Sequence, residues 1–425
     1  MSALVPVAEQ LSRVLSAVTP LPVESVPLAD AAGRWLAEDV VARAAVPPWD
    51  NAAMDGYAVR HRDVADASPS SPVTLQVVAD LPAGTAADPA LGSGQAARIM
   101  TGAPVPLAAD TVVRLEDTDR DDPFAPLAAT VTVRCRTTLG RNVRRAGEDL
   151  PVGGLVAPAG THARPAVLAA LAAAGHGVVP VRRAPRVAVI ATGSELVDPG
   201  TGLTRGRIPD SNSLLVSGLV SGAGGRVVAT DRVPDDPQAL ARALVAVGGC
   251  DVVVLTGGVS AGAFDPVKQL FAGSNQVAFT RVAMQPGKPQ AFGRLPGGGL
   301  LFGLPGNPVS VWVSFHVFVR PALLAMQGAA DDAVHPAPVA ARAGAGWESP
   351  EGRTQYLPAR LAADPRGWVV RPVGPLGSAS HLVASLAAAT GYAIVPADRT
   401  VVAPGDLVDA VVTDPCWGEG VPWTS

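Results

Sequence analysis

Cysteine is scarce in this chain, and the three cysteines lie far apart in the sequence. Cys135, Cys250 and Cys416 form no Cys-x-x-Cys pair, so the pattern predicts neither a zinc knuckle nor a redox-active disulfide. The six histidines likewise form no His-Glu-x-x-His spacing. A sparse, odd number of cysteines is typical of a protein in a reducing compartment.

The sequence also lacks an excess of basic residues. There are 33 Lys and Arg against 37 Asp and Glu, and the net charge of −4 argues against a nucleic-acid partner. The N-terminus has no basic segment followed by an apolar one, as a secretory signal would have. Since no apolar run of about 18 residues is free of Gly, Pro and charge, we expect no membrane span and a cytoplasmic location.

Lysine is the rarest of the charged residues, with only Lys268 and Lys288. A GC-rich gene explains a general bias toward arginine. A lysine that persists in such a chain is nevertheless a candidate for a position that arginine cannot fill. An ammonium group is a compact point charge, whereas a guanidinium group is a wide planar fork.

What the sequence does contain is enough apolar residues for several large cores. Of 425 residues, 48% are apolar and 16% are charged, and this length indicates two to four domains. The 45 glycines and 41 prolines indicate many turns and argue against an all-helical fold.

The first 184 residues alternate between helical and β-type patterns. An amphipathic helix is expected over 7–18 and a second helix over 29–42, and an alanine-rich helix from Pro165 ends at Gly175. Short Val- and Thr-rich runs between 60 and 145 are typical of strands. We therefore predict a discontinuous linker domain over 1–45 and 146–184, and a β-rich domain over 46–145.

The pattern changes after residue 184. Short apolar strands alternate with helices, which predicts a doubly wound, mostly parallel sheet over 185–331 with helices on both faces. Short β-type runs return beyond that segment, as in GWVVRPV, GYAIVPA and DLVDAVV. They predict a small β-barrel domain over 332–425.

Three glycine-containing loops follow the predicted strands of the parallel sheet. In such sheets ligands bind beyond the carboxyl ends of the strands, and glycine lets backbone N–H groups approach a phosphate or another oxyanion. The alternative is that these are ordinary turns. The candidate binding residues in the loops are Thr192, Gly193, Ser194, Gly257, Gly258, Ser260, Pro305, Gly306 and Asn307.

Charged residues flank the same loops. Glu195 and Asp265 follow strand ends that we expect to be neighbours, and they are candidates to share Mg²⁺, which commonly binds one or two carboxylates plus a substrate phosphate. Asp235 fits a site acid and a helix cap equally well. Arg281 and Lys288 lie in RVAMQPGKP, where the Gly-Pro context would fix the lysine; a solvated lysine is the alternative.

Eight segments together resemble one known family, the molybdopterin molybdenumtransferases, to which the C-terminal domain of gephyrin belongs. They occur in the family's order: DNAAMDGYAV (50–59), RIMTGAPVP (98–106), RRAGED (144–149), ATGSEL (191–196), PDSN (209–212), GGVSAG (257–262), PGKP (286–289) and GLPGNPVS (303–310).

The resemblance implies a homodimer of elongated, four-domain subunits whose central domain shares its fold with molybdopterin adenylyltransferases. The implied reaction takes adenylyl-molybdopterin and molybdate to molybdenum cofactor and AMP, with Mg²⁺. It also implies transient contact with the adenylyltransferase and with cofactor-accepting enzymes. The active site would lie between the central domain of one subunit and the β-rich domain of the other.

The matching motifs carry the family's functional residues onto this chain. Asp55 and Thr101 would act from the β-rich domain across the dimer. The acids of the central domain would be Glu195, Asp235 and Asp265. Lys288 would hold the oxyanion, and Arg353 and Ser380 would be the contribution of the C-terminal domain.

Two departures from the family pattern bear on the anion. Gln285 stands where many relatives have a lysine, and Ser194 stands in place of the first acid of TGDE. A neutral amide supplies no charge, so we expect weaker molybdate binding or a shifted preference, such as for tungstate. Two alternatives stay open: adenylyltransferase activity, and a non-catalytic scaffold like gephyrin.

Overall fold

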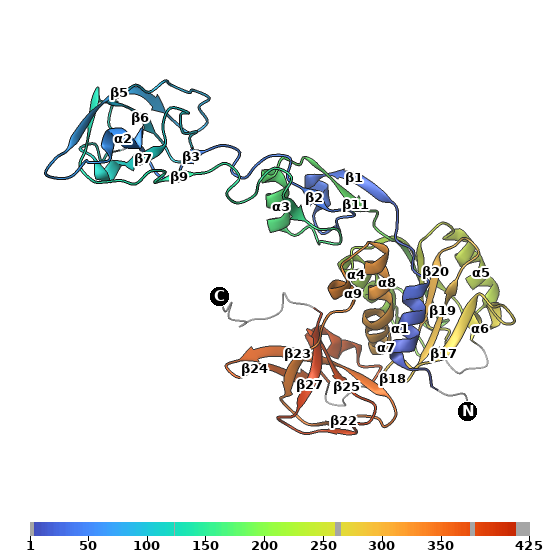
Figure 1. The fold of residues 1–425 in the computed structure, drawn as a ribbon. Coiled ribbons are helices and arrows are strands. Elements are labelled where there is room, and N and C mark those ends of the chain that lie inside the picture. Colours follow the sequence, from blue (N-terminus) through green and yellow to red (C-terminus); the bar gives the residue numbers. More distant parts are fainter. Residues whose placement is uncertain (1–3, 123, 260–264, 375–378, 414–425) are drawn as a thin grey trace.

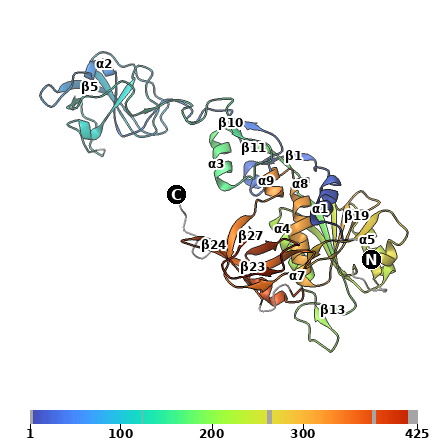
Figure 2. The same ribbon diagram turned by 60° about the horizontal axis from the view of Figure 1, so that its bottom comes forward.

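The computed structural model describes residues 4–122, 124–259, 265–374 and 379–413. Figure 1 shows an elongated molecule, with a β-rich unit at one end, a small linker unit next to it, and a large sheet and a barrel at the other end. Figure 2 shows the same separation of the β-rich unit from the large sheet. The residue boundaries of the domains stay a prediction.

A six-stranded sheet forms the central unit, in the order β15-β12-β16-β20-β19-β17. Its parallel strands are β12 (Arg186–Thr192), β15 (Arg226–Val233), β16 (Val252–Thr256) and β20 (Leu300–Leu304). At one edge, β19 (Pro289–Arg294) and β17 (Val277–Arg281) pair antiparallel. β16 and β20 are buried along their whole length, because helices cover both faces of the sheet, and their sequences are accordingly mostly apolar. The predicted mostly parallel sheet is confirmed.

Helices cover both faces of this sheet. Val187 and Val189 of β12 pack with α4 (Asn212–Gly222), α7 (Pro308–Ser314), η3 (Phe315–Val319) and α8 (Arg320–Met326). Ala188 and Ile190 face the opposite layer, α5 (Pro237–Ala246) and α6 (Pro266–Leu270). This division follows from the alternation of side chains along a strand. The first helix, α1 (Val7–Ser16), packs on the α8 side through Val14.

The segments α7, η3 and α8 form one continuous helix from Pro308 to Met326. By its length of 19 residues and its mean hydropathy of 1.5, this helix could cross a membrane. However, 83% of its most apolar window is buried inside the protein. It is therefore a helix of the protein core.

The β-rich unit has a five-stranded sheet in the order β7-β4-β6-β5-β8. The strands are β4 (Gly56–Val59), β5 (Val73–Leu81), β6 (Gln95–Ile99), β7 (Thr111–Arg114) and β8 (Thr130–Val133), and β3 (Asn51–Ala52) pairs with β9 (Val143–Arg144). Gly56 of the MDGYA motif packs against a neighbouring strand, since a Cβ there would lie 2.0 Å from the carbonyl oxygen of Val113. Any other residue would push β4 and β7 apart.

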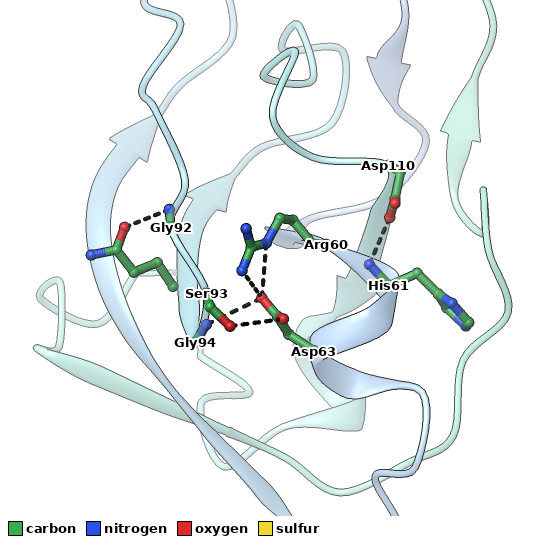
Figure 3. Close-up of polar contacts among 8 residues, drawn as sticks. Arg60, His61, Asp63, Gly92, Ser93, Gly94 and Asp110 are labelled. Atoms are coloured by element: carbon green, nitrogen blue, oxygen red, sulfur yellow. Dashed lines mark hydrogen bonds and ion pairs between the residues drawn. The ribbon is translucent and has the colours of Figure 1, made fainter.

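A cluster of polar contacts holds the short helix α2 (His61–Val64) in this unit (Figure 3). Asp63 accepts two hydrogen bonds from Arg60, at 2.8 and 2.9 Å, and one from the backbone of Gly94 at 3.1 Å. Asp110 accepts the first backbone N–H of the helix at 2.7 Å. Burial alone would raise the pKa of Asp63, but these donors hold it below its ordinary value. The cluster therefore stabilises the unit.

The linker unit is built from short pairs of strands. β1 (Val23–Pro27) pairs with β11 (Val178–Arg182), and β2 (Val40–Val41) pairs with β10 (Leu155–Ala157). The helix α3 (Pro165–Ala173) packs against β10 and the turn η1 (Leu28–Ala31). An ion pair between Arg183 and Asp251, with N–O distances of 2.7 and 2.9 Å, ties this unit to the central sheet.

The helix predicted over 29–42 does not form, and that prediction is wrong. The chain makes only the short turn η1, and Gly33 then has a φ of 73°, which breaks the helix. Leu36 donates its N–H to the carbonyl of Thr161 at 2.9 Å and bridges to Val181. Pairing with distant segments thus satisfies the backbone groups that a helix would have satisfied locally.

The C-terminal unit is a small barrel, as predicted. It consists of β21 (Val339–Ala343), β23 (Thr354–Asp364), β24 (Gly367–Pro372), β25 (Gly391–Val395) and β27 (Leu407–Val412). The barrel closes because β23 pairs with both β24 and β25. The remaining short elements are η2 (Leu115–Asp117), β13 (Leu196–Val197), β14 (Ile208–Pro209), β18 (Met284–Gln285), α9 (Asp331–Val334), β22 (Trp347–Glu348), η4 (Val383–Ala388) and β26 (Val401–Val402).

His316, on η3, makes the stability of the fold depend on pH. Burial, with a smaller contribution from the charge of Arg320, lowers the pKa of His316 from 6.5 to about 3. The unfolded chain therefore binds this proton below about pH 6.5, whereas the folded protein does not until about pH 3. The contribution of the neutral ring to stability is complete above pH 6.5 and is lost as the pH falls toward 3.

We expect His316→Phe to remove this pH dependence. The measurement is the free energy of unfolding in urea at pH 7 and at pH 4. The wild-type protein should lose on the order of 3 kcal/mol more than the variant between these two pH values. Equal losses in the two proteins would show that His316 is accessible to protons in the folded state.

Candidate functional site

A cleft of about 860 Å³ opens at the carboxyl ends of the parallel strands. This is the edge at which ligands bind in open parallel sheets. The three loops that the sequence singles out all reach it. They contribute Thr192, Gly257, Gly258, Pro305, Gly306 and Asn307 to its lining.

One end of the cleft is acidic. Glu195 and Asp235 are both exposed, and both line it. The backbone N–H of Ser194 donates to Oδ2 of Asp235 at 3.1 Å, and the N–H of Asp235 donates to Oγ of Ser194 at 3.2 Å. Asp235 is thus fixed beside the loop that carries Glu195. The Glu195 carboxylate accepts no hydrogen bond from any of the described residues, so it is open to a ligand.

The other end of the cleft carries two cations from different units. Lys288 follows β18, and Arg353 precedes β23 in the barrel. Parallel pairing of β18 with β23, in which Gln285 lies opposite Gln355, brings the two segments together. Within the described parts of the chain, neither the Lys288 ammonium group nor the Arg353 guanidinium group has a hydrogen bond or an ion pair. Such a pair of cations can bind an oxyanion.

The backbone that carries Lys288 is held rigidly. Gly287 has a φ of 99°, and a Cβ on it would lie 2.8 Å from Oγ of Ser314. The buried side chain of Gln290 donates to the carbonyl of Gly287 at 2.6 Å and to Ser314 at 2.7 Å. The lysine therefore extends from a fixed loop, as the Gly-Pro context predicts.

Two asparagines connect the loops around the cleft. Asn212 donates from its amide to the carbonyl of Gly306 at 2.7 Å. Asn307 donates to Oγ of Ser380 at 2.8 Å, and the N–H of Val309 donates to the carbonyl of the same serine at 3.1 Å. The central unit thus holds the barrel loop in place at the cleft.

The lining also contains polar residues that were not among the predicted site residues, namely Asp210, Ser211, Asn212, Thr256, Ser310 and His381. Asp210 and Asn212 belong to the PDSN motif, which was a signal for both. Asp210 also caps α4, because it accepts hydrogen bonds from the N–H of Ser213 at 3.0 Å and from its hydroxyl at 2.6 Å. His381 follows Ser380 directly in SASHL, and only that neighbour pointed to it.

Several predicted residues are not part of the cleft lining. Gly193 and Ser194 lie next to it, between Thr192 and Glu195, which do line it. Arg281 is an exposed residue at the end of β17 and does not line the cleft. Ser260 lies outside the described residues.

Asp265 is placed differently from the other predicted acids. It is 5% exposed, and its Oδ1 accepts the N–H of Lys268 at 3.2 Å, which caps α6. It is absent from the cleft lining. Among the described residues there is no group of three His, Cys, Asp or Glu side chains that could hold a metal ion by themselves. A shared Mg²⁺ on Glu195 and Asp265 therefore stays a prediction.

Asp55 and Thr101 lie together on the β-rich unit. The backbone N–H and the hydroxyl of Thr101 both donate to Oδ1 of Asp55, at 2.6 and 2.7 Å. Both residues are far from the cleft of their own chain, since the β-rich unit is at the other end of the molecule in both views (Figures 1 and 2). One chain therefore does not bring all the predicted residues into one site.

Comparison with known proteins identifies the family. The model of the MoeA N-terminal region (domain I and II) matches residues 5–175, that of a probable molybdopterin binding domain matches 188–325, and that of the MoeA C-terminal region (domain IV) matches 340–413. Molybdopterin molybdenumtransferase 2 of Mycobacterium tuberculosis is 42% identical over 389 residues, covering 90% of this chain and 93% of that protein. The chain belongs to the MoeA family of molybdopterin molybdenumtransferases.

Further members of the MoeA family match almost end to end. The molybdopterin molybdenumtransferase of Staphylococcus aureus is 32% identical over 412 residues, covering 96% of each chain. A crystal structure of the molybdopterin biosynthesis moeA protein from Pyrococcus horikoshii has a TM-score of 0.78 at 30% identity, covering 96% of this chain and 100% of that one. The chain is thus a transferase of molybdenum-cofactor biosynthesis, with the fold of this family.

The hydrogen bond between Asn307 and Ser380 gives a test of how this MoeA-family cleft is assembled. We expect Asn307→Ala to raise the rate of amide exchange in residues 379–383 about fivefold, because one partly exposed hydrogen bond contributes about 1 kcal/mol. Asn212→Ala is the matched control, because it removes a bond to Gly306 instead. Unchanged exchange in Asn307→Ala would mean that the barrel loop is held by other contacts.

Proposed function

We propose that this cleft inserts molybdate into adenylyl-molybdopterin and releases AMP. The observation that carries the proposal concerns two cations, Lys288 and Arg353, which have no ion-pair partner among the described residues and line the same cleft as acidic side chains. Membership of the molybdenumtransferase family supports the choice of molybdate as the anion.

Charge neutralisation is the main contribution of the protein in this proposal. Molybdate and a phosphoanhydride are both negative, and bringing them together is opposed by Coulomb repulsion. Lys288 and Arg353 bind the oxyanion, and Gln285 and Ser380 donate neutral hydrogen bonds to it. Backbone N–H groups at Gly258 and Gly306 bind the phosphates. Positioning and fixed charges supply most of the rate, because the reacting bonds belong to the substrates.

Magnesium fits the acidic end of the cleft. Mg²⁺ usually keeps several waters and uses only one or two carboxylates plus phosphate oxygens, so a complete cage of protein ligands is not required. Glu195 is the first ligand in this proposal, since its carboxylate is exposed and free of hydrogen bonds from the described residues. Asp235 lies beside it, and Asp265 is the second ligand that the sequence predicts. When bound, Mg²⁺ would screen the phosphates and stabilise charge on the departing AMP.

The complete site in this proposal includes a second subunit. Asp55 and Thr101 are too far from the cleft of their own chain, and a homodimer would place those of one subunit beside the cleft of the other. Thr101 holds one oxygen of Asp55, and the second accepts no hydrogen bond from the described residues, which suits a role in moving protons as oxo groups leave molybdate. The proposal places the enzyme in the cytoplasm, with transient contacts to the adenylyltransferase and to the enzymes that accept the cofactor.

Product analysis tests this function against its alternatives. The protein is incubated with adenylyl-molybdopterin, molybdate and Mg²⁺, and released AMP and cofactor are measured. A parallel incubation with molybdopterin and ATP measures ATP consumption. We expect AMP release that depends on molybdate, and no ATP consumption. ATP consumption would favour the adenylyltransferase alternative, and neither activity would favour the non-catalytic scaffold.

Replacement of Glu195 tests the magnesium site. We expect Glu195→Gln, which keeps the shape but not the charge, to raise the half-saturating Mg²⁺ concentration at least about tenfold, the effect of losing a charged contact. The matched control is Asp198→Asn, since Asp198 is acidic, lies nearby and pairs only with Arg232 among the described residues. An unchanged Mg²⁺ requirement in Glu195→Gln would place the ion elsewhere, and Asp265→Asn would then be the next variant.

A series at positions 288 and 285 tests the oxyanion site. Lys288→Arg should raise the half-saturating molybdate concentration, because the wider guanidinium cannot occupy the place of the ammonium group. Lys288→Ala should raise it further. Gln285→Lys should lower it by about tenfold, as expected for one added charged hydrogen bond. Tungstate is tested in parallel. An unchanged value in Lys288→Ala would show that this lysine is only a solvated charge.

Mixed dimers test whether the site is shared. The assay uses a molybdate concentration far below the half-saturating value of Lys288→Ala, so that Asp55→Ala and Lys288→Ala should each be inactive alone. After subunit exchange, half of the dimers are mixed and each contains one intact site, so activity should recover to about one quarter of the wild-type value. Light scattering first establishes that the protein is a dimer. Mixed dimers that form, as shown by mass tags, but stay inactive would contradict the shared site.

A further inference from the structure

A second cavity, of about 250 Å³, lies apart from the catalytic cleft. It is enclosed by α1, the long helix at η3 and α8, and the barrel. Most of its lining is apolar, including Val7 and Leu11 of α1, Pro321 of α8 and Ile394 of β25. Six polar side chains interrupt this apolar lining, and they belong to His316, Arg320, His335, Tyr356, Tyr392 and Thr413.

Arg320 brings a positive charge into this cavity. Its guanidinium group donates one hydrogen bond, to the carbonyl of Ala333 at 3.3 Å. No carboxylate of the described residues lies within ion-pair distance of it. A guanidinium group has five N–H donors, and a charge removed from water is costly unless it is paired. Burial accordingly lowers the pKa of Arg320. The cavity therefore favours an anion.

Three of the other polar groups, those of His316, Tyr356 and Tyr392, can donate hydrogen bonds to such an anion without adding charge. Nε2 of His316 is shielded from solvent and has no hydrogen-bond partner among the described residues. Tyr356 and Tyr392 are 9% and 7% exposed, and their hydroxyls make no hydrogen bond to described groups. Burial raises the pKa of Tyr356 to about 12, and that of Tyr392 is raised too, so both hydroxyls stay protonated.

The backbone is irregular at this cavity. η3 is a π turn within an otherwise α-helical segment, and it carries His316 and leads directly into Arg320. Such turns are rare and are frequently found at functional sites. The π turn is thus an observation independent of the polar groups, and it points to the same place.

We propose that this cavity binds a small organic monocarboxylate whose aromatic or branched apolar body fills the lining and whose carboxylate pairs with Arg320. A single guanidinium matches a single negative charge and binds a carboxylate with two parallel hydrogen bonds. An inorganic dianion would lose more hydration than a single guanidinium group and a few hydroxyl and imidazole donors can replace. The apolar lining favours an organic body over a fully hydrated ion.

The ligand would contact elements that also form the catalytic cleft. Tyr356 lies on β23 three residues after Arg353, which lines the cleft. The helix that carries His316 begins at Pro308, which also lines the cleft. Binding in the cavity is measured first, without catalysis. Because these elements are shared, the effect of the ligand on molybdate use is measured afterwards.

The test is direct titration of the full-length protein by calorimetry. The probes are benzoate, phenylacetate and isovalerate, and the matched controls are benzamide, which is neutral, and sulfate, which has no apolar body. We expect at least one carboxylate to bind with millimolar affinity or better, and both controls to bind at least about tenfold more weakly. Failure of all three carboxylates to bind at about 10 mM overturns the proposal, as does equal binding of benzamide or sulfate.

Variants assign the binding to this cavity. Arg320→Met, which keeps the length of the side chain without its charge, should weaken carboxylate binding by at least about tenfold. Arg242→Met, at an exposed arginine of α5, should leave it unchanged. Tyr392→Phe retains the ring and should weaken binding several-fold, so it decides the matter if Arg320→Met does not fold. Unchanged affinity in a folded Arg320→Met, or in Tyr392→Phe when the first variant does not fold, overturns the proposal.

Discussion

The arrangement of the candidate site depends on one short strand pairing, that of β18 with β23. Met284 lies opposite Thr354 and Gln285 opposite Gln355, so the connection between β17 and β19 in the central unit runs beside the start of β23 in the barrel. Lys288 is three residues beyond one partner and Arg353 directly precedes the other. Without this pairing the two cations would belong to separately moving units, and neither alone would hold a dianion in water against its hydration.

The division of charge within the cleft follows from the same architecture. The acids come from loops after the parallel strands, where glycine and helix starts expose backbone N–H groups, and the cations come from the junction with the barrel. Keeping opposite charges at opposite ends leaves the Lys288 and Arg353 side chains without an ion-pair partner among the described residues, so their charge is available to a substrate. The fixed loop at Gly287 and the Asn307–Ser380 hydrogen bond hold these groups in place before a ligand binds. Little further conformational entropy of the protein is therefore lost on binding.

The sequence was most informative where the pattern was local and repeated. Val187 to Ile190 are apolar at every position, which indicates burial on both faces and hence a parallel sheet. The helix expected over 29–42 failed because Leu36 pairs with distant residues, and periodicity carries no information on such pairing. The sequence also did not predict that Asp265 caps a helix or that Arg281 is exposed at the end of a strand, because both positions depend on tertiary structure. The cavity at Arg320 was invisible in the sequence, since HVFVRPALLAM reads as a plain apolar helix.

The central claim is that Lys288 and Arg353 together form the molybdate site. The most direct measurement is an anomalous difference map from crystals of the protein soaked in molybdate, collected at the molybdenum absorption edge. The account predicts a peak in hydrogen-bond contact with both the Lys288 ammonium group and the Arg353 guanidinium group. An ordered molybdate at the acidic end of the cleft, or anywhere that touches neither cation, would contradict it.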